Sequence, residues 1–299
     1  MDMSQFKFYS IGIVATNKLL TEKTVEIYPI EILPFLDGEI SDSFNEIMAK
    51  GIDASNKEYE INAIITNSLV AEWLQFGSNR LTAPDVRRGE RVFIWRYGNN
   101  DKFYWSSMGL DDNLRKLETV VWTFSDTPDE SKEEINEETV YSLEVSTHTK
   151  QITLKTAKGN GEPYTYVLQF NTGEGVVTLA DDDGQLIELN SDKKRITLEN
   201  HFETLVQLDK KIINVYAPDT INMEAVNTIN VKATTINVDA TDINVKADSI
   251  NVESNSIDIN TNTMNAIGQT SISFTVGAST LSLSPASINI KTPALIGST

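Results

Sequence analysis

The sequence predicts an all-β protein in three parts: a small N-terminal barrel, a β-prism neck, and a C-terminal triple-stranded, intertwined β-helix built by a trimer. Three observations lead to this prediction. An Ile-Asn-Val unit recurs every seven or eight residues after Ile213, the first 126 residues alternate apolar and polar side chains at many points, and short strand patterns fill the region between them. A chain of 299 residues suits two or three domains.

The C-terminal repeat consists of three-residue units in which two apolar residues flank a polar one. The first residues of successive units lie 8, 8, 7, 7, 7 and 7 positions apart, starting at Ile213, and weaker copies begin at Ile272, Leu281 and Ile288. Apolar residues two positions apart share one face of a strand but not of a helix, so the period of seven does not indicate a coiled coil. Each unit is expected to form a very short strand followed by a corner.

Such short strands need partner strands that cover their apolar side chains. A single-chain solenoid would be expected to use corner glycines, yet no glycine lies between Gln185 and Ile267. Three chains wound about one axis would bring their apolar rows together and pair their backbones. Residues 211–299 are therefore predicted to form a homotrimeric needle, with a monomeric β-solenoid or an adhesive stalk as the alternative. The predicted trimer core consists of Ile213, Val215, Ile221, Ile229, Val231, Ile236, Val238, Ile243, Val245, Ile250, Val252, Ile257 and Ile259.

Residues 1–126 predict a small antiparallel barrel, with the oligonucleotide/oligosaccharide-binding (OB) type as the leading candidate. The expected strands are residues 6–15, 24–33, 59–66, 91–97, 102–108 and 117–124. Residues 78–90 are expected to form a loop that enters a strand, with a turn at Arg88-Gly89-Glu90. The aromatic residues between Trp95 and Trp105 suggest a stacking platform for single-stranded nucleic acid, but the acidity of the region favours core packing, cross-strand pairs and contact with a protein partner.

An acidic stretch at residues 127–139 is expected to be a linker or a solvated short helix. Strand patterns resume over residues 140–210 and predict a β-prism neck that leads into the needle. The sequence Asp181-Asp182-Asp183-Gly184 is interpreted as a solvated turn, because the ligand spacing of an EF-type cation loop is missing.

Composition narrows the classes of function. The net charge of -18 disfavours binding to nucleic acid or to anionic membranes. The chain has no cysteine and two histidines, which excludes disulfides and thiolate sites and disfavours zinc sites. No secretory leader and no apolar segment of membrane-spanning length are recognised, so a soluble protein made in a cytoplasm is expected. No catalytic, cofactor-binding or metal-binding residue is predicted, and the protein is not expected to be an enzyme.

A barrel followed by a prism with a seven- or eight-residue repeat resembles the central spike proteins of contractile bacteriophage tails. It is also similar to the spikes of type VI secretion systems and contractile bacteriocins. Residues 78–97, with Asn79-Arg80 and the run from Pro84 to Glu90, and the repeat of residues 213–259 carry this resemblance. It implies a homotrimer in the tail baseplate of a virion, assembled in the host cytoplasm, whose needle sheath contraction drives through the host outer membrane. It also implies that the barrel docks on a baseplate hub protein, with Arg80, Asp85, Arg87 and Arg88 as candidate docking residues.

Two departures from the family's pattern affect what the resemblance implies. No insertion large enough for a lysozyme domain separates barrel and needle, and no histidine follows His201, so an iron-binding apex is not expected. A small separate tip protein is expected to cap the C-terminal end instead. Two alternatives have the same architecture: a trimeric tail fibre or adhesin that binds host-surface glycan, and a type VI-like spike that carries an effector.

Overall fold

The structure, a computed structural model, describes residues 5–32, 45–52, 57–65, 68–128, 136 and 138–294. Its regular elements are β-strands and one short 3-10 helix, Asp112–Leu114, so the predicted all-β class is confirmed. Within these residues, no helix has the length and apolar character needed to cross a membrane. The chain divides into two units, residues 1–227 and 228–299, which are described separately.

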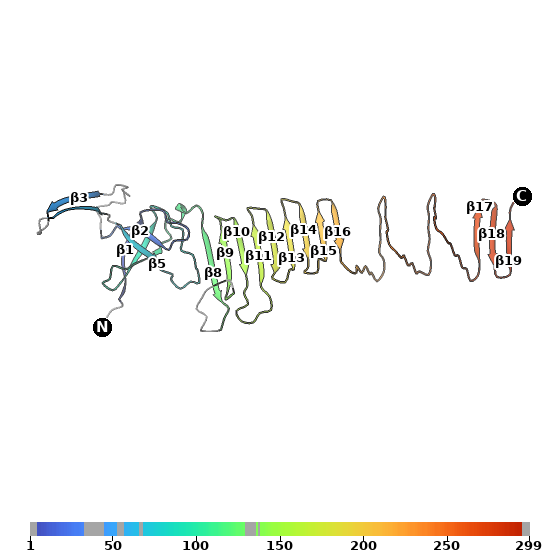
Figure 1. The fold of residues 1–299 in the computed structure, drawn as a ribbon, viewed down its shortest axis with the longest axis horizontal. Helices are drawn as coiled ribbons and strands as arrows, with labels where there is room; N and C mark the ends of the chain where they lie inside the picture. Colours follow the sequence, from blue (N-terminus) through green and yellow to red (C-terminus); the bar gives the residue numbers. More distant parts are fainter. Residues whose placement is uncertain are drawn as a thin grey trace. The chain divides into compact units, whose positions relative to one another are not determined.

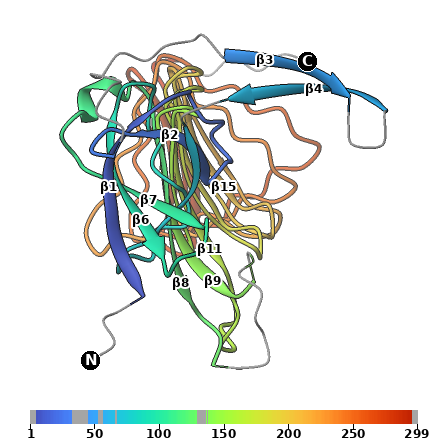
Figure 2. The same cartoon turned by 90° about the vertical axis from the view of Figure 1, so that its left-hand side faces the viewer.

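Five strands close into a barrel near the N-terminus (Figure 1). They are β1 (Phe6–Val14), β2 (Thr24–Pro29), β5 (Leu69–Trp73), β6 (Arg91–Tyr97) and β7 (Phe103–Ser107). Their order around the barrel is β1-β2-β5-β7-β6, and β5 and β7 pair in parallel whereas the other neighbours are antiparallel. Figure 2 shows β1, β6 and β7 side by side in one wall.

The barrel encloses a compact apolar core, which consists of Val14, Val25, Ile27, Ala71, Ala83, Val86, Val92, Ile94 and Trp105. Gly12 on β1 permits the close packing of this core. A Cβ atom at this position would lie 2.2 Å from Cγ2 of Ile27 and 2.6 Å from Cδ1 of Ile94. The indole nitrogen of Trp105 donates to the carbonyl of Lys23 at 3.0 Å, which satisfies the polar atom of the largest buried side chain.

Two strands that were expected in the barrel lie elsewhere. The predicted strand at residues 59–66 is β4 (Glu58–Ile65), which pairs with β3 (Asn45–Ile52) in a separate hairpin. The predicted strand at residues 117–124 is β8 (Thr119–Ser125), which belongs to the next sheet. The third barrel strand is β5, which the sequence analysis missed. The predicted end of the second strand, Leu33, lies outside the described residues.

The second part is a nine-stranded antiparallel sheet in which each strand pairs with the next along the chain (Figure 1). It runs from β8 through β9 (Val140–Ser146), β10 (Gln151–Lys155), β11 (Tyr166–Asn171), β12 (Val176–Asp181), β13 (Leu186–Asn190), β14 (Arg195–Glu199) and β15 (Leu205–Asp209) to β16 (Ile212–Tyr216). The strands expected within residues 140–210 are confirmed. The sheet extends beyond that region at both ends, and most of the acidic stretch 127–139 lies outside the described residues.

The turns along one edge of this sheet are bonded to each other. Lys150, Gly175 and Lys194 each end a turn with a positive φ, of 58°, 70° and 58°. Their carbonyls accept N–H groups from the next turn, with the N–H of Thr172 bonded to Lys150, that of Ser191 to Gly175 and that of Lys210 to Lys194. The edge is therefore cross-linked turn to turn as well as strand to strand.

The aspartate-rich segment forms the turn predicted from the sequence. The carboxylate of Asp181 accepts the N–H groups of Asp183 and Gln185 at 3.0 and 2.8 Å, and Gly184 takes a positive φ of 97°. The pKa of Asp182 is lowered by a side-chain bond from Lys158 and by the N–H of Thr165. The Asp181 carboxylate thus stabilises the turn, and the Asp182 carboxylate bonds the turn to the segment between β10 and β11.

The last part of the chain differs from a uniform repeat. Residues 217–271 contain no strand, whereas β17 (Ile272–Val276), β18 (Ser279–Ser284) and β19 (Ser287–Lys291) form an antiparallel three-stranded sheet. The weaker repeat copies at Ile272, Leu281 and Ile288 are therefore strands that pair within the chain. Gly277, with a φ of 54°, and the turn at Pro285 reverse the chain here, whereas residues 221–259 contain neither glycine nor proline.

Candidate functional site

One face of the nine-stranded sheet carries two unbroken apolar rows. Residues directly opposite each other in an antiparallel pair point to the same face, so the strand register defines these rows. The first row consists of Trp122, Leu143, Leu154, Leu168, Leu179, Ile187, Leu198, Val206 and Val215. The second consists of Val120, Val145, Ile152, Phe170, Val177, Leu189, Ile196, Leu208 and Ile213. We call this surface the apolar face.

The apolar face is incompletely covered by its own chain. Most of its side chains on β10 to β15 are 40–49% exposed, and Ile213 on β16 is 70% exposed. In each strand, the residue between the two apolar ones points to the opposite face and is polar from β9 to β16. This polar row consists of Glu144, Thr153, Gln169, Thr178, Glu188, Thr197, Gln207 and Asn214. A sheet with one polar and one apolar face buries the apolar one against another surface, and complete burial of a Leu or Ile side chain contributes about 1.5–3 kcal/mol.

The three-stranded C-terminal sheet repeats this arrangement. Ile272, Leu283 and Ile288 lie opposite one another, and so do Phe274, Leu281 and Ile290. Phe274, Ile288 and Ile290 are more than half exposed. The second unit therefore presents an apolar face with the same two-row pattern.

In the segment of the chain between the two sheets, the backbone forms no strand pairing within its own chain. Every residue from 218 to 271 is exposed, and none of the backbone-to-backbone hydrogen bonds found among the described residues involves this segment. The predicted trimer-core residues of this segment, from Ile221 to Ile259, are 50–69% exposed. Ile213 and Val215 lie at the ends of the two apolar rows on β16. A segment with regular apolar side chains and an unpaired backbone is a template for pairing with other strands.

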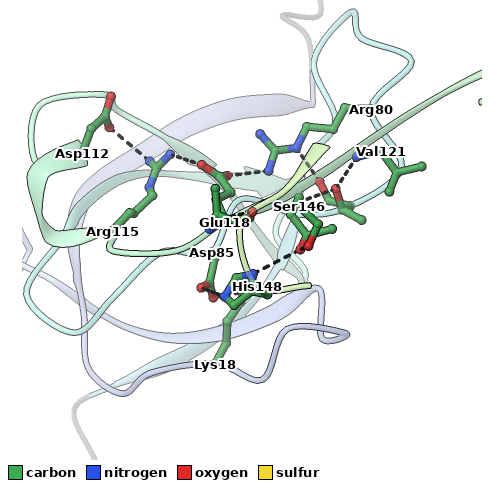
Figure 3. A network of polar contacts seen from close by, with 12 residues as sticks. Lys18, Arg80, Asp85, Asp112, Arg115, Glu118, Val121, Ser146 and His148 are labelled. Carbon is green, nitrogen blue, oxygen red and sulfur yellow. Dashed lines mark hydrogen bonds and ion pairs between the residues drawn. The ribbon is translucent and has the colours of Figure 1, made fainter. Parts of the chain in front are cut away.

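Figure 3 shows a second feature, a charged junction that joins the barrel to the sheet. Glu90, at the start of β6, is 0% exposed, and it accepts Nε of Arg115 at 3.0 Å and the N–H of Arg87 at 3.1 Å. Arg115 also pairs with Asp112 at 3.2 Å and with Glu118 at 3.7 Å. Burial lowers the pKa of Arg115, but the bond and charge of Glu90 more than compensate, so the pKa is raised.

The second group of the junction surrounds a buried carboxylate. Asp85, 2% exposed, pairs with Arg87, with Nζ of Lys18 at 3.9 Å and with Nε2 of His148 at 3.5 Å. Nδ1 of His148 lies 3.1 Å from the hydroxyl of Thr119 on β8. Burial lowers the pKa of Lys18, and the charge of Asp85 opposes this effect in part. The group connects the β1–β2 loop and residues 78–90 with β8 and with the turn between β9 and β10.

The four candidate hub-docking residues occupy different environments. Arg80 donates from Nη2 to Glu118 at 2.6 Å and from Nε to the carbonyl of Thr82 at 2.6 Å. Asp85 and Arg87 belong to the buried group just described, and the backbone N–H of Arg88 donates to Asn17 at 2.9 Å. Three of the four thus bond within the junction. Glu90, which the sequence predicted only as part of a turn, belongs to the junction, and four residues from other segments that the sequence did not point to complete it: Lys18, Arg115, Glu118 and His148.

Removing the carboxylate of Glu90 is expected to destabilise the junction. Glu90→Ala leaves the guanidinium of Arg115, whose side chain is 12% exposed, without its main partner. Breaking such a buried pair costs about 3–5 kcal/mol of unfolding free energy. Asp101→Asn is the matched control, because the Arg96–Asp101 pair has a 97% exposed carboxylate and contributes at most about 1 kcal/mol. Denaturant unfolding followed by tryptophan fluorescence measures both, and equal midpoints would contradict a stabilising role for the Glu90 pair.

Comparison with known proteins found no relative of this chain. No protein-family model matches the chain, and no curated protein is similar to it in sequence. In the described part of the chain, no cluster of three or more His, Asp or Glu side chains is arranged to hold a metal ion. The candidate site consists of the apolar face with its unpaired extension, together with the charged junction between barrel and sheet.

Proposed function

We propose that this protein is the central spike of a contractile tail baseplate, a homotrimer that is driven through a host outer membrane by sheath contraction. The observation that carries the proposal is the unpaired segment 218–271, whose isoleucines recur every seven or eight residues and whose backbone pairs with no other strand of its own chain. Three chains wound around one axis give every strand two neighbours and bury every isoleucine. The resulting triple-stranded β-helix is the needle.

The rest of the chain fits the same assembly. In the trimer, the apolar faces of three nine-stranded sheets turn toward one axis and form the β-prism neck. The strand order β1-β2-β5-β7-β6, with β5 and β7 parallel, supports the assignment of the barrel to the OB type. The barrel docks on a hub protein in the baseplate, and a small tip protein caps the end after β19.

The proposed role is mechanical. A prism in which hydrogen bonds run continuously around three chains resists axial load, because the chains separate only by unwinding. The charged junction at Glu90 and Asp85 transmits that load between barrel and neck. No chemical step is part of this role.

The mass of the purified protein in solution tests the proposal. Light scattering or sedimentation should give three chains of 33.3 kDa per particle, elongated in shape. The particle should also stay intact on an SDS gel until the sample is boiled, since intertwined chains dissociate only after unfolding. A compact monomer would overturn the proposal, and binding of an intact trimer to host-surface glycan would favour the tail-fibre or adhesin role.

A further inference from the structure

The barrel carries an aromatic groove on the wall formed by β1, β6 and β7. Trp95 lies at its centre, with the rings of Phe6, Phe8 and Phe76 at centroid distances of 5.8, 5.6 and 5.3 Å. The indole nitrogen of Trp95 donates to the hydroxyl of Ser106 at 3.1 Å, so the polar atom of this ring is satisfied within its own barrel. The rest of the Trp95 ring is apolar.

The groove has room for side chains of another molecule. It encloses about 400 Å³ and is lined by Trp73, Phe76, Phe93 and Trp95, with Arg80 and Ser107 at its margin. Phe76 is 55% exposed, and Phe8 beside the groove is 47% exposed. Contiguous aromatic surface of this kind marks an interaction site.

The groove is continuous with the apolar face of the sheet. Arg80 forms an antiparallel bridge with Trp122, the first residue of one apolar row, so both side chains point to the same side. Arg80 also lines the groove, and its charge is neutralised by Glu118 at 2.6 Å. The apolar surface thus continues from β8 across the stem of Arg80 onto the barrel.

We infer that the aromatic groove is part of the self-association surface and that the barrel of a second copy of this chain covers it. The inference rests on the proposed homotrimer. A copy held along the apolar rows lies beside β8, and its own barrel is brought next to the groove because the same charged junction fixes barrel to sheet in every copy. In a cyclic trimer each barrel then offers its groove to the next.

Cysteine labelling of the full-length protein tests this inference. The chain has no cysteine, so a single introduced thiol is unique. Ser107→Cys places the thiol at the groove, and Val70→Cys is the control, a 62% exposed position on β5 that does not line the groove. In the native trimer, the Ser107→Cys thiol is expected to react at least about tenfold more slowly than the Val70→Cys thiol, since a packed interface must open before reagent enters. Spin labels at Ser107→Cys should also lie closer together across copies than those at Val70→Cys.

The outcomes separate the inference from the function it rests on. A trimer in which both thiols react equally, or in which the Ser107→Cys labels are the more distant pair, overturns the inference and leaves the spike proposal standing. A monomer by light scattering overturns both. Protection of Ser107→Cys that appears only after a hub protein or a glycan is added assigns the groove to that partner and also overturns the inference.

A charge in the groove provides a second test that does not depend on how fast a reagent reaches the introduced thiol. Phe76→Asp is expected to lengthen the distances between labels on the barrels while the particle keeps three chains, because the neck and needle still hold the trimer together. Val70→Asp is the control and should leave the distances unchanged. Unchanged distances in Phe76→Asp would contradict the inference.

Discussion

Val245→Asp is expected to abolish the trimer. Val245 is 69% exposed within its own chain, so the substitution removes no intrachain packing. In the proposed needle, three aspartates would meet at one level of the axis. An uncompensated buried charge costs about 3–5 kcal/mol, and three like charges in close contact repel one another further. Light scattering should therefore show single chains or aggregates where the parent protein gives three-chain particles.

Asn244→Asp is the matched control for this result. It adds the same charge one residue earlier, on the side chain that alternation places on the outside of the needle. The trimer and its melting temperature should stay close to those of the parent. If Val245→Asp formed a trimer with a normal melting temperature, the assignment of Val245 to the axis would be wrong.

The repeat could be interpreted from the sequence because its signal is local. Alternation of apolar and polar residues within Ile243-Asn244-Val245 is sufficient to predict an extended chain with one apolar face. The same reasoning predicted strands within residues 140–210, where β9 to β15 lie. It did not distinguish pairing within a chain from pairing between chains, which is why the copies from Ile272 onward were placed in the needle. The glycine at 277 was the available signal for a reversal.

In the barrel, alternation of apolar and polar residues predicted strands but not their partners. Residues 59–66 and 117–124 have strand patterns and form strands, but a pattern does not identify the sheet to which a strand belongs. β5 is a five-residue strand whose partners, β2 and β7, lie far from it along the chain. Its parallel pairing with β7 is a tertiary contact that no local period reveals.

The charged junction was inaccessible to sequence reasoning for a related reason. Asp85, in the loop before β6, and His148, in the turn between β9 and β10, are 63 positions apart, and Glu90 meets Arg115 across 25 positions. A chain with 43 acidic and 25 basic residues offers too many possible pairs for any one to stand out. The pairs of the junction differ from the other possible pairs because they are buried. The burial of a polar side chain depends on the tertiary fold and not on the local sequence.

Leu208→Asp is expected to dissociate the neck and to reduce the three-chain particle to monomers. Leu208 lies in the second apolar row on β15 and is 42% exposed in the single chain. Within one chain its carboxylate would still reach water, so the strands of the sheet should persist. Between three chains that meet through their apolar faces the same carboxylate would be desolvated without a counter-charge, at a cost of about 3–5 kcal/mol per copy.

Gln207→Asp separates this effect from a general loss of strand propensity. Gln207 is the preceding residue of β15 and faces the opposite side, where its Nε2 lies 3.4 Å from the hydroxyl of Thr197 and its Oε1 accepts from Asn214 at 3.4 Å. The same substitution there should cost about 1 kcal/mol or less through these long bonds and leave three chains per particle. If both variants stayed trimeric, the apolar face would not be the surface through which the chains meet. If both variants became monomeric, the cause would be disruption of strand β15 and not the charge on the apolar face. Only dissociation of Leu208→Asp alone places the axis of the trimer on the apolar side of the sheet, because both substitutions put the same charge on neighbouring residues of β15 but on opposite faces.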